Sequence, residues 1–176
     1  MRTRRLSALT LVLALTLAVP SAAAGAQGEP SAIGGGSFLY AGTIPMQFSF
    51  GAVLHADGST DGSFHHFYAD GGFTYDFWGT VTCLTFDSLN HRAWVGGVLT
   101  KVTSTDPEVN DPATGLFPGD DAWFRVLDSP DGDRSTAMGF VGVFESSQQY
   151  CDDQPWPDGN ARTHPVTSGQ IRVDAP

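Results

Sequence analysis

Apolar and polar side chains alternate at every other position through most of the chain after residue 36, and this pattern limits the folds open to it. Residues 73–86 show it best, because aromatic and aliphatic residues take one set of positions while threonine and aspartate fill the other. Successive side chains of a strand point to opposite faces, so one face of this segment becomes apolar. No window carries a 3.6-residue apolar stripe with caps. The pattern predicts an all-β fold.

Turns rich in glycine and aspartate separate further alternating segments. Besides 73–86, strands are predicted at 37–41, 47–54, 62–69, 91–102, 122–127, 137–145 and 170–173. About eight short, mostly antiparallel strands indicate either a sandwich or a closed barrel, and the sequence does not distinguish the two.

The turn at residues 87–90 suggests how the two longest strands pair. If Phe86 pairs with His91, then Cys83 lies opposite Trp94. Opposed residues point to the same face, so this register joins the apolar residues of both strands into one buried surface. Two long connections, 104–121 and 146–168, are expected to be functional or irregular loops because they exceed the usual loop length.

The first residues have the three parts of a secretory signal. A basic start is followed by an uncharged apolar run at 6–19 and by a small-residue tract that ends at Ala26. We therefore expect a signal peptide at 1–26, a short flexible segment at 27–36 and a single β domain at 37–176, secreted into the extracellular space. No later run is long enough to span a bilayer, so no membrane association is expected after cleavage.

Charge narrows the possible partners. The leader holds three of the nine basic residues, which leaves six against nineteen acidic ones and a mature net charge of −13. Such a surface repels phosphate backbones and anionic membranes, so no nucleic-acid partner is expected.

Cys83 and Cys151 are the only cysteines, and both follow the leader. In an oxidising compartment a disulfide between them is expected, with two unpaired buried thiols as the alternative. Closing a loop of about 70 residues would stabilise the fold by about 4 kcal/mol in the chain-entropy model.

An ordered set of short motifs spans nearly all of the chain after the leader. The set comprises Gly34-Gly35-Gly36, Phe48-x-Phe50 with Asp57-Gly58, Gly79-Thr80-Val81-Thr82-Cys83-Leu84, Ala93-x-Val95-Gly96-Gly97-Val98, Phe124-x-Val126-x-Asp128, Asp133-Arg134 and Gly169-Gln170-Ile171-x-Val173. In this the chain resembles a post-COAP-like family of small exported bacterial β-domains. The turn at 128–131 departs from that family's pattern. The resemblance implies a β fold and export, and it implies no enzymatic activity or catalytic residue.

Carboxylates form the most notable polar clusters. Asp128, Asp131 and Asp133 share one short loop, and oxygen-rich turns of this kind suit Ca²⁺. Solvated turn carboxylates are the alternative, and no other cofactor is indicated. Further acids at 106–111, 120–121 and 152–153 leave open a carboxylate-based extracellular hydrolase, although no nucleophile motif is present.

The histidines give a weaker indication of metal. His65 and His66 are adjacent, so their rings should point to opposite faces of a strand and cannot readily bind one ion. His55 could approach His66 across the turn between their strands.

Two tryptophans are candidates for ligand binding. Trp78 falls on the polar face of its strand beside threonines, and Trp156 lies between two prolines in the second long connection. Exposed indole rings in such settings can stack on a sugar or a partner side chain. The preferred hypothesis is a secreted, non-catalytic module that binds an extracellular ligand or surface polymer. A hydrolase and a barrel enclosing a small apolar ligand are the alternatives.

Overall fold

Most of the alternating segments become strands in the computed structural model, which describes residues 28–140 and 142–176. The elements are β1 (Ser31–Tyr40), β2 (Ile44–Leu54), β3 (Thr60–Asp70), β4 (Phe73–Asp87), β5 (Arg92–Ser104), β6 (Asp121–Leu127), β7 (Arg134–Ser135), β8 (Gly139–Phe140), α1 (Ser147–Asp153) and β9 (His164–Asp174). The predicted signal peptide lies outside the described residues.

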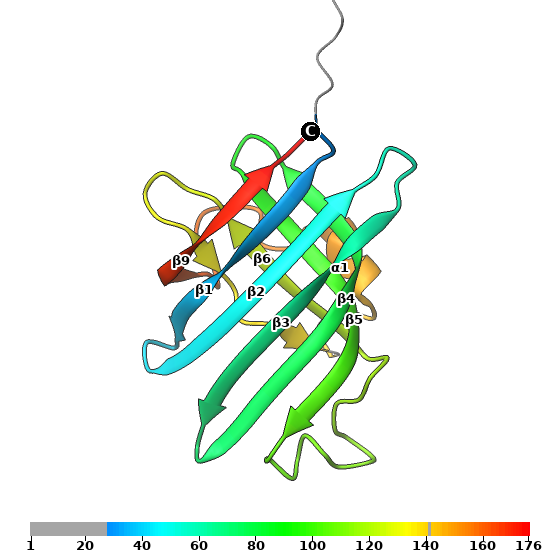
Figure 1. Cartoon of the computed structure of the whole chain (residues 1–176), viewed down its shortest axis with the longest axis vertical. Coiled ribbons are helices and arrows are strands. Elements are labelled where there is room, and N and C mark those ends of the chain that lie inside the picture. Colours follow the sequence, from blue (N-terminus) through cyan, green and yellow to red (C-terminus); the bar gives the residue numbers. More distant parts are fainter. Residues whose placement is uncertain (1–27, 141) are drawn as a thin grey trace, which may run out of the picture.

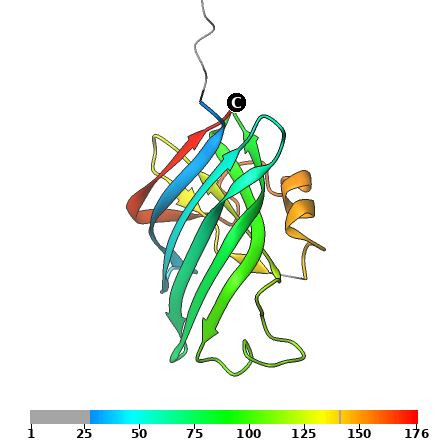
Figure 2. The same cartoon turned by 45° about the vertical axis from the view of Figure 1, so that its right-hand side comes forward.

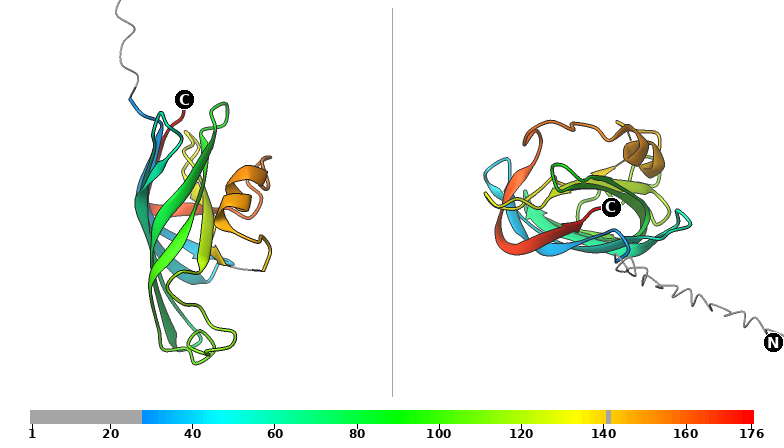
Figure 3. Two further views of the ribbon diagram at one scale, coloured as in Figure 1. Left: turned by 90° about the vertical axis from the view of Figure 1, so that its right-hand side faces the viewer. Right: turned by 90° about the horizontal axis from the view of Figure 1, so that it is seen from above.

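The sheet closes on itself (Figure 1). Strands β1 to β6 pair in sequence order, β6 pairs on its other side with β7 and β8, β7 pairs with β9, and β9 returns to β1, all antiparallel. Because β7 and β8 together fill one position, the ring is an eight-stranded antiparallel barrel, and the view from above shows it closed (Figure 3). The all-β prediction is confirmed, and a barrel rather than a sandwich is formed.

The first strand begins earlier than predicted. β1 starts at Ser31, so most of the segment 27–36 that was expected to be flexible is part of the sheet, paired with both β2 and β9. The glycines there serve a close approach of the neighbouring strand, since a Cβ on Gly34 would lie 2.9 Å from the carbonyl oxygen of Gln170. Glycine in this segment allows the neighbouring strand to pack closely, and it does not make the segment flexible.

The predicted strand 137–145 is wrong over most of its length. Of its described residues, 137–140 and 142–145, those of β8 alone are in a strand, and the chain then forms α1 against the outside of β4 and β5 (Figure 2). The side chain of Ser146 accepts a hydrogen bond from the Gln149 amide and caps the helix. This Ser-x-x-Gln spacing is a capping signature, and it indicates a helix start even in a segment without an apolar stripe.

The β4–β5 register differs from the prediction. Phe86 pairs with Ala93, two residues from the predicted partner, which leaves the faces unchanged because side chains alternate with a period of two. A β-bulge between Val81 and Cys83 then adds one residue and reverses the faces. Val81 therefore points into the barrel, whereas Cys83 lies on the outer face beneath α1.

The barrel interior is filled by aromatic rings, as the narrow bore of eight strands allows. The buried phenylalanines are Phe38, Phe48, Phe50, Phe64, Phe77 and Phe124. A second buried cluster lies outside the barrel, where Tyr150 of α1 packs with Trp94 of β5 and Trp123 of β6, and Trp156 from the loop after the helix packs against them. The disulfide between Cys83 and Cys151 is confirmed, and it joins β4 to α1 on this covered face.

Candidate ligand-binding site

A pocket of about 250 Å³ lies on the outer side of β8, beside the covered face. It is lined by Tyr40, Trp123, Thr136, Ala137, Met138, Gly139, Phe140, Val143, Tyr150, Trp156 and Arg162. The pocket lies beside the break between β7 and β8, and residues 136–140 line one side of it. The alternation predicted a continuous strand from residue 137 onward. The backbone between β7 and β8 is instead irregular, and it borders the cavity.

Gly139 sets the depth of this pocket. A Cβ at this position would lie 2.5 Å from Nε1 of Trp123, so only glycine lets the β8 backbone approach the indole ring this closely. Within the described residues the Trp123 indole N–H has no hydrogen-bond partner, and it is therefore a donor that a ligand can use.

Aromatic rings form the walls. Trp123 stacks on Tyr150 with centroids 5.8 Å apart, and Phe144 meets Trp156 edge-on at 6.0 Å. The guanidinium of Arg162 lies 4.4 Å from the centre of the Trp156 ring. Trp156, predicted as a stacking residue, thus lines a pocket, with a cation held over its ring.

A second, smaller cavity of about 220 Å³ lies at the end of the barrel on the other side of the same segment. It shares Tyr40, Ala137, Met138 and Phe140 with the first pocket, and its far wall includes Tyr68 and Tyr75, which stack at 4.4 Å. The rest of the interior is packed with phenylalanine, so the space for an enclosed ligand is limited to this end.

Arginines gather around residues 154–163, which we call the covering segment. Arg125 donates a hydrogen bond to the Ala161 carbonyl oxygen, Arg134 donates to Thr163, and Arg162 belongs to the segment. Arg92 is buried close to Arg125. Four of the six basic residues that follow residue 26 are these arginines.

Burial shapes the ionisation of the covered face. It lowers the pKa of Arg125, an effect that Tyr150 opposes and the positive charge of Arg92 reinforces. Burial also raises the pKa of Tyr150, which is fully enclosed. The hydroxyl of Tyr150 therefore keeps its proton, and Arg125 lies in an environment that disfavours an uncompensated charge.

Trp78, the other predicted stacking residue, lies on the open outer face of β4. Its ring is 43% exposed and stacks on His65 at 3.8 Å, and His65 in turn bonds Asp76 at 2.7 Å. The structure does not bring Trp78 and Trp156 together, because they lie on different faces of the barrel.

The three calcium candidates have different roles. Asp133 accepts a hydrogen bond from the Ile171 amide at 2.6 Å, and Asp128 accepts one from the Val173 amide at 3.1 Å, so both carboxylates hold β9. Asp131 is exposed. In residues 28–140 and 142–176 no three metal-ligating side chains come together, and the calcium site at Asp128, Asp131 and Asp133 stays a prediction.

The other acids mostly close their own turns. Asp106 accepts from the Glu108 amide and from the Tyr75 hydroxyl, and Asp111 accepts from the amides of Ala113 and Thr114. These contacts are structural and do not favour the hydrolase hypothesis.

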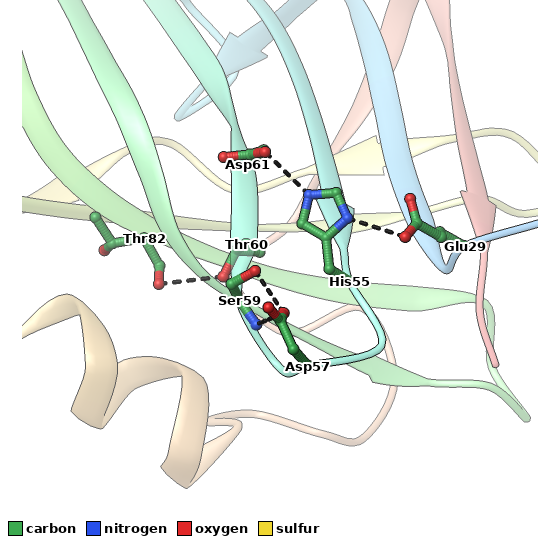
Figure 4. Close-up of polar contacts among 7 residues, drawn as sticks. All are labelled: Glu29, His55, Asp57, Ser59, Thr60, Asp61 and Thr82. Atoms are coloured by element: carbon green, nitrogen blue, oxygen red, sulfur yellow. Dashed lines mark hydrogen bonds and ion pairs between the residues drawn. The ribbon is translucent and has the colours of Figure 1, made fainter.

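His55 lies in a polar cluster with Glu29 and Asp61 (Figure 4), close to the C-terminal residues 174–176. Its two ring nitrogens are each 3.0 Å from a carboxylate oxygen, one of Glu29 and one of Asp61, and these bonds raise the pKa of His55. The prediction that His55 approaches His66 is wrong, since His66 is enclosed among the phenylalanines inside the barrel. His65 lies on the open face, so the adjacent rings point apart as expected.

Sequence analysis missed Arg92, Arg125 and Tyr150. A signal did exist, because Arg125 interrupts the apolar run 122–127. The alternation places Arg125 on the outer face of its strand, but it does not show that α1 and the covering segment bury that face. An arginine on the outer face of a strand is ordinarily exposed.

No helix in the described part is long and apolar enough to cross a membrane. Comparisons with protein-family models, with curated proteins and with solved structures each found no match. The resemblance to the post-COAP-like family therefore stays a prediction. The fold is established as an eight-stranded antiparallel barrel with a disulfide-linked helix on its outer face.

Proposed function

We propose that this chain is a secreted, non-catalytic binding domain that holds a flat unit of an extracellular ligand, such as a sugar ring of a surface polymer, in the pocket beside β8. The observation that carries the proposal is the pocket wall. Trp156, Trp123 and Tyr40 offer ring faces and edges, while the Trp123 indole N–H and Arg162 supply donors. Aromatic faces with a few directed donors suit the apolar face and hydroxyl edge of a sugar.

Export is part of the proposal. The leader-like residues 1–26 support it, and the disulfide between Cys83 and Cys151 is weakly consistent with an oxidising compartment. The groups that line the pocket bind a ligand by contact and hydrogen bonding, and the proposal assigns no bond-breaking step to them.

Binding can be tested with soluble polysaccharides by calorimetry and affinity electrophoresis, using neutral xylan and mixed-linkage glucan beside acidic polygalacturonate. We expect wild-type protein to bind at least one polymer and Trp156→Ala to bind about tenfold more weakly, since loss of a stacked ring costs about 1.4 kcal/mol. Trp78→Ala removes a tryptophan from the open face and is the matched control. Absence of binding to every polymer, or loss in Trp78→Ala alone, would overturn the assignment.

A small apolar ligand at the barrel end is a second candidate, favoured by the stacked pair Tyr68 and Tyr75 at the cavity of about 220 Å³. Tyrosine fluorescence quenching by a planar hydrophobic dye distinguishes the sites. Tyr68→Ala should weaken dye binding at the barrel end and leave polymer binding at Trp156 unchanged.

A further inference from the structure

Two arginines are buried on the covered face without a carboxylate. Arg125 is 1% exposed and Arg92 is 6% exposed, and neither forms an ion pair with any described residue. Of the other four basic residues after residue 26, Lys101 and Arg172 have carboxylate partners, Asp76 and Asp174. Arg134 donates hydrogen bonds to Thr163, and Arg162 lies over the ring of Trp156. Arg92 and Arg125 are therefore the two cations that are both buried and without a carboxylate partner among the described residues.

Most of their nitrogens lack an acceptor. Nη2 of Arg125 donates to the Ala161 carbonyl oxygen, whereas its Nε and Nη1 are buried with no hydrogen-bond partner among the described residues. Nε and Nη1 of Arg92 and the Tyr150 hydroxyl are likewise buried without a hydrogen-bond partner among the described residues. Buried polar atoms normally find partners, so a group of unsatisfied donors in one place calls for a physical explanation.

The strand register brings these donors to one side of the barrel. Arg125 pairs with Trp94 and Arg92 pairs with Leu127, so the arginines are diagonal neighbours on the outer face of β5 and β6. Diagonal neighbours in an antiparallel pair are about 7–8 Å apart. Tyr150 comes from α1 above this face, close enough for its charge and that of Arg125 to interact.

Two like charges in a poorly hydrated site repel each other and are costly to desolvate. A bound anion between them removes both penalties, and a guanidinium matches the paired oxygens of a carboxylate, phosphate or sulfate. The protonated Tyr150 hydroxyl adds a neutral donor from the opposite side. Arg92 keeps some exposure, which leaves a way in from solvent beside it.

We propose that Arg92, Arg125 and the Tyr150 hydroxyl bind a small oxoanion between the β5–β6 face and α1. The site shares Tyr150 with the wall of the aromatic pocket, but Arg92 and Arg125 do not line that pocket, and the proposal does not depend on the sugar-binding proposal. The anion is either a free inorganic ion or an acidic group carried by a larger ligand, and the chemistry of recognition is the same for both.

Thermal unfolding of the exported protein, with and without sodium phosphate or sodium sulfate at constant ionic strength, tests the site. We expect a saturable rise in Tm of about 5 °C at roughly a hundredfold excess over Kd, with sodium chloride giving no such rise. Calorimetry with trigalacturonate, beside a neutral xylotriose, forms the second arm. Saturation by phosphate or sulfate identifies a free ion, and saturation by trigalacturonate alone identifies an acid carried by a ligand.

Three variants locate the effect. Arg125→Met should abolish the anion-dependent shift, and Tyr150→Phe should weaken anion binding several-fold while keeping the ring in place. Arg172→Gln removes one exposed positive charge from the outside of β9, where Arg172 is paired with Asp174, and should respond like wild type. Should Arg125→Met fail to fold, Tyr150→Phe retains the test, because it deletes only an unpartnered hydroxyl.

The proposal is overturned if no oxoanion in either arm gives a saturable response. It is equally overturned if Arg125→Met and Tyr150→Phe both respond like wild type, since binding would then lie elsewhere. Neither result affects the polymer-binding test, whose readout depends on Trp156.

Discussion

The two outer faces of the same barrel differ in what covers them. On β3 and the first part of β4, before Cys83, the outer side chains are largely open to solvent, so Trp78 is 43% exposed and stacks on His65. On β5 and β6 the outer side chains lie under α1 and the covering segment, so Trp94 is fully buried and Arg125 almost so. Both faces arise from the same alternation. On one of them α1, which is linked to β4 by a disulfide, and the covering segment bury a second cluster of side chains that includes the arginines Arg92 and Arg125.

Replacing one tryptophan on each face gives the largest expected contrast. Trp94→Ala should lower the free energy of unfolding by about 5 kcal/mol, because it empties a buried site and loses the hydrogen bond from Trp94 Nε1 to the Pro155 carbonyl oxygen. Trp78→Ala should cost less than about 1 kcal/mol, since its ring is already partly in water. Urea denaturation measures both, and similar costs at the two sites would contradict the contrast.

Removing the disulfide should weaken the packing of α1 on β4 and β5 more than it weakens the barrel itself. The paired variant Cys83→Ser with Cys151→Ser should lose about 4 kcal/mol, because the bond closes a loop with a sequence separation of 68 residues. Tryptophan fluorescence should shift to the red as the covered indoles meet water. A variant as stable as wild type, with unshifted fluorescence, would show that packing alone holds α1 in place.

The neighbours His65 and His66 separate the open face from the interior. Burial lowers the pKa of His66 to about 3. The unfolded chain therefore binds an additional proton below the ordinary value near 6.5, so the stability due to neutral His66 is lost as pH falls from 6.5 towards 3.

Between pH 7 and pH 4 this histidine should account for about 3 kcal/mol of the fall in unfolding free energy. His66→Leu should remove that part of the pH dependence, and His65→Leu, on the open face, should retain it. Denaturant midpoints at the two pH values measure the difference. Equal pH dependence in His66→Leu and wild type would show that His66 is not the group responsible.

Much of the fold follows from local pattern. The alternation located β2, β3, β4, β5 and β6 to within a few residues, and the two cysteines were enough to predict the pairing of Cys83 with Cys151. The candidate site was predictable only in part. Trp156 was predicted as a candidate and lines the pocket, but Trp123, Tyr150 and Arg162 were not predicted, because they come from separate elements that meet only in the folded chain.

The sequence by itself determined that this is an all-β protein with a bridge between two distant cysteines, because side-chain alternation and thiol chemistry act locally or pairwise. The tertiary structure decided that the sheet closes into a barrel, that a bulge turns Cys83 outward, and that one outer face is covered while the other is open. Those outcomes depend on which remote segment packs on which face. The packing of a remote segment on one face depends on contacts between residues far apart in the chain, and neither periodicity nor composition predicts such contacts.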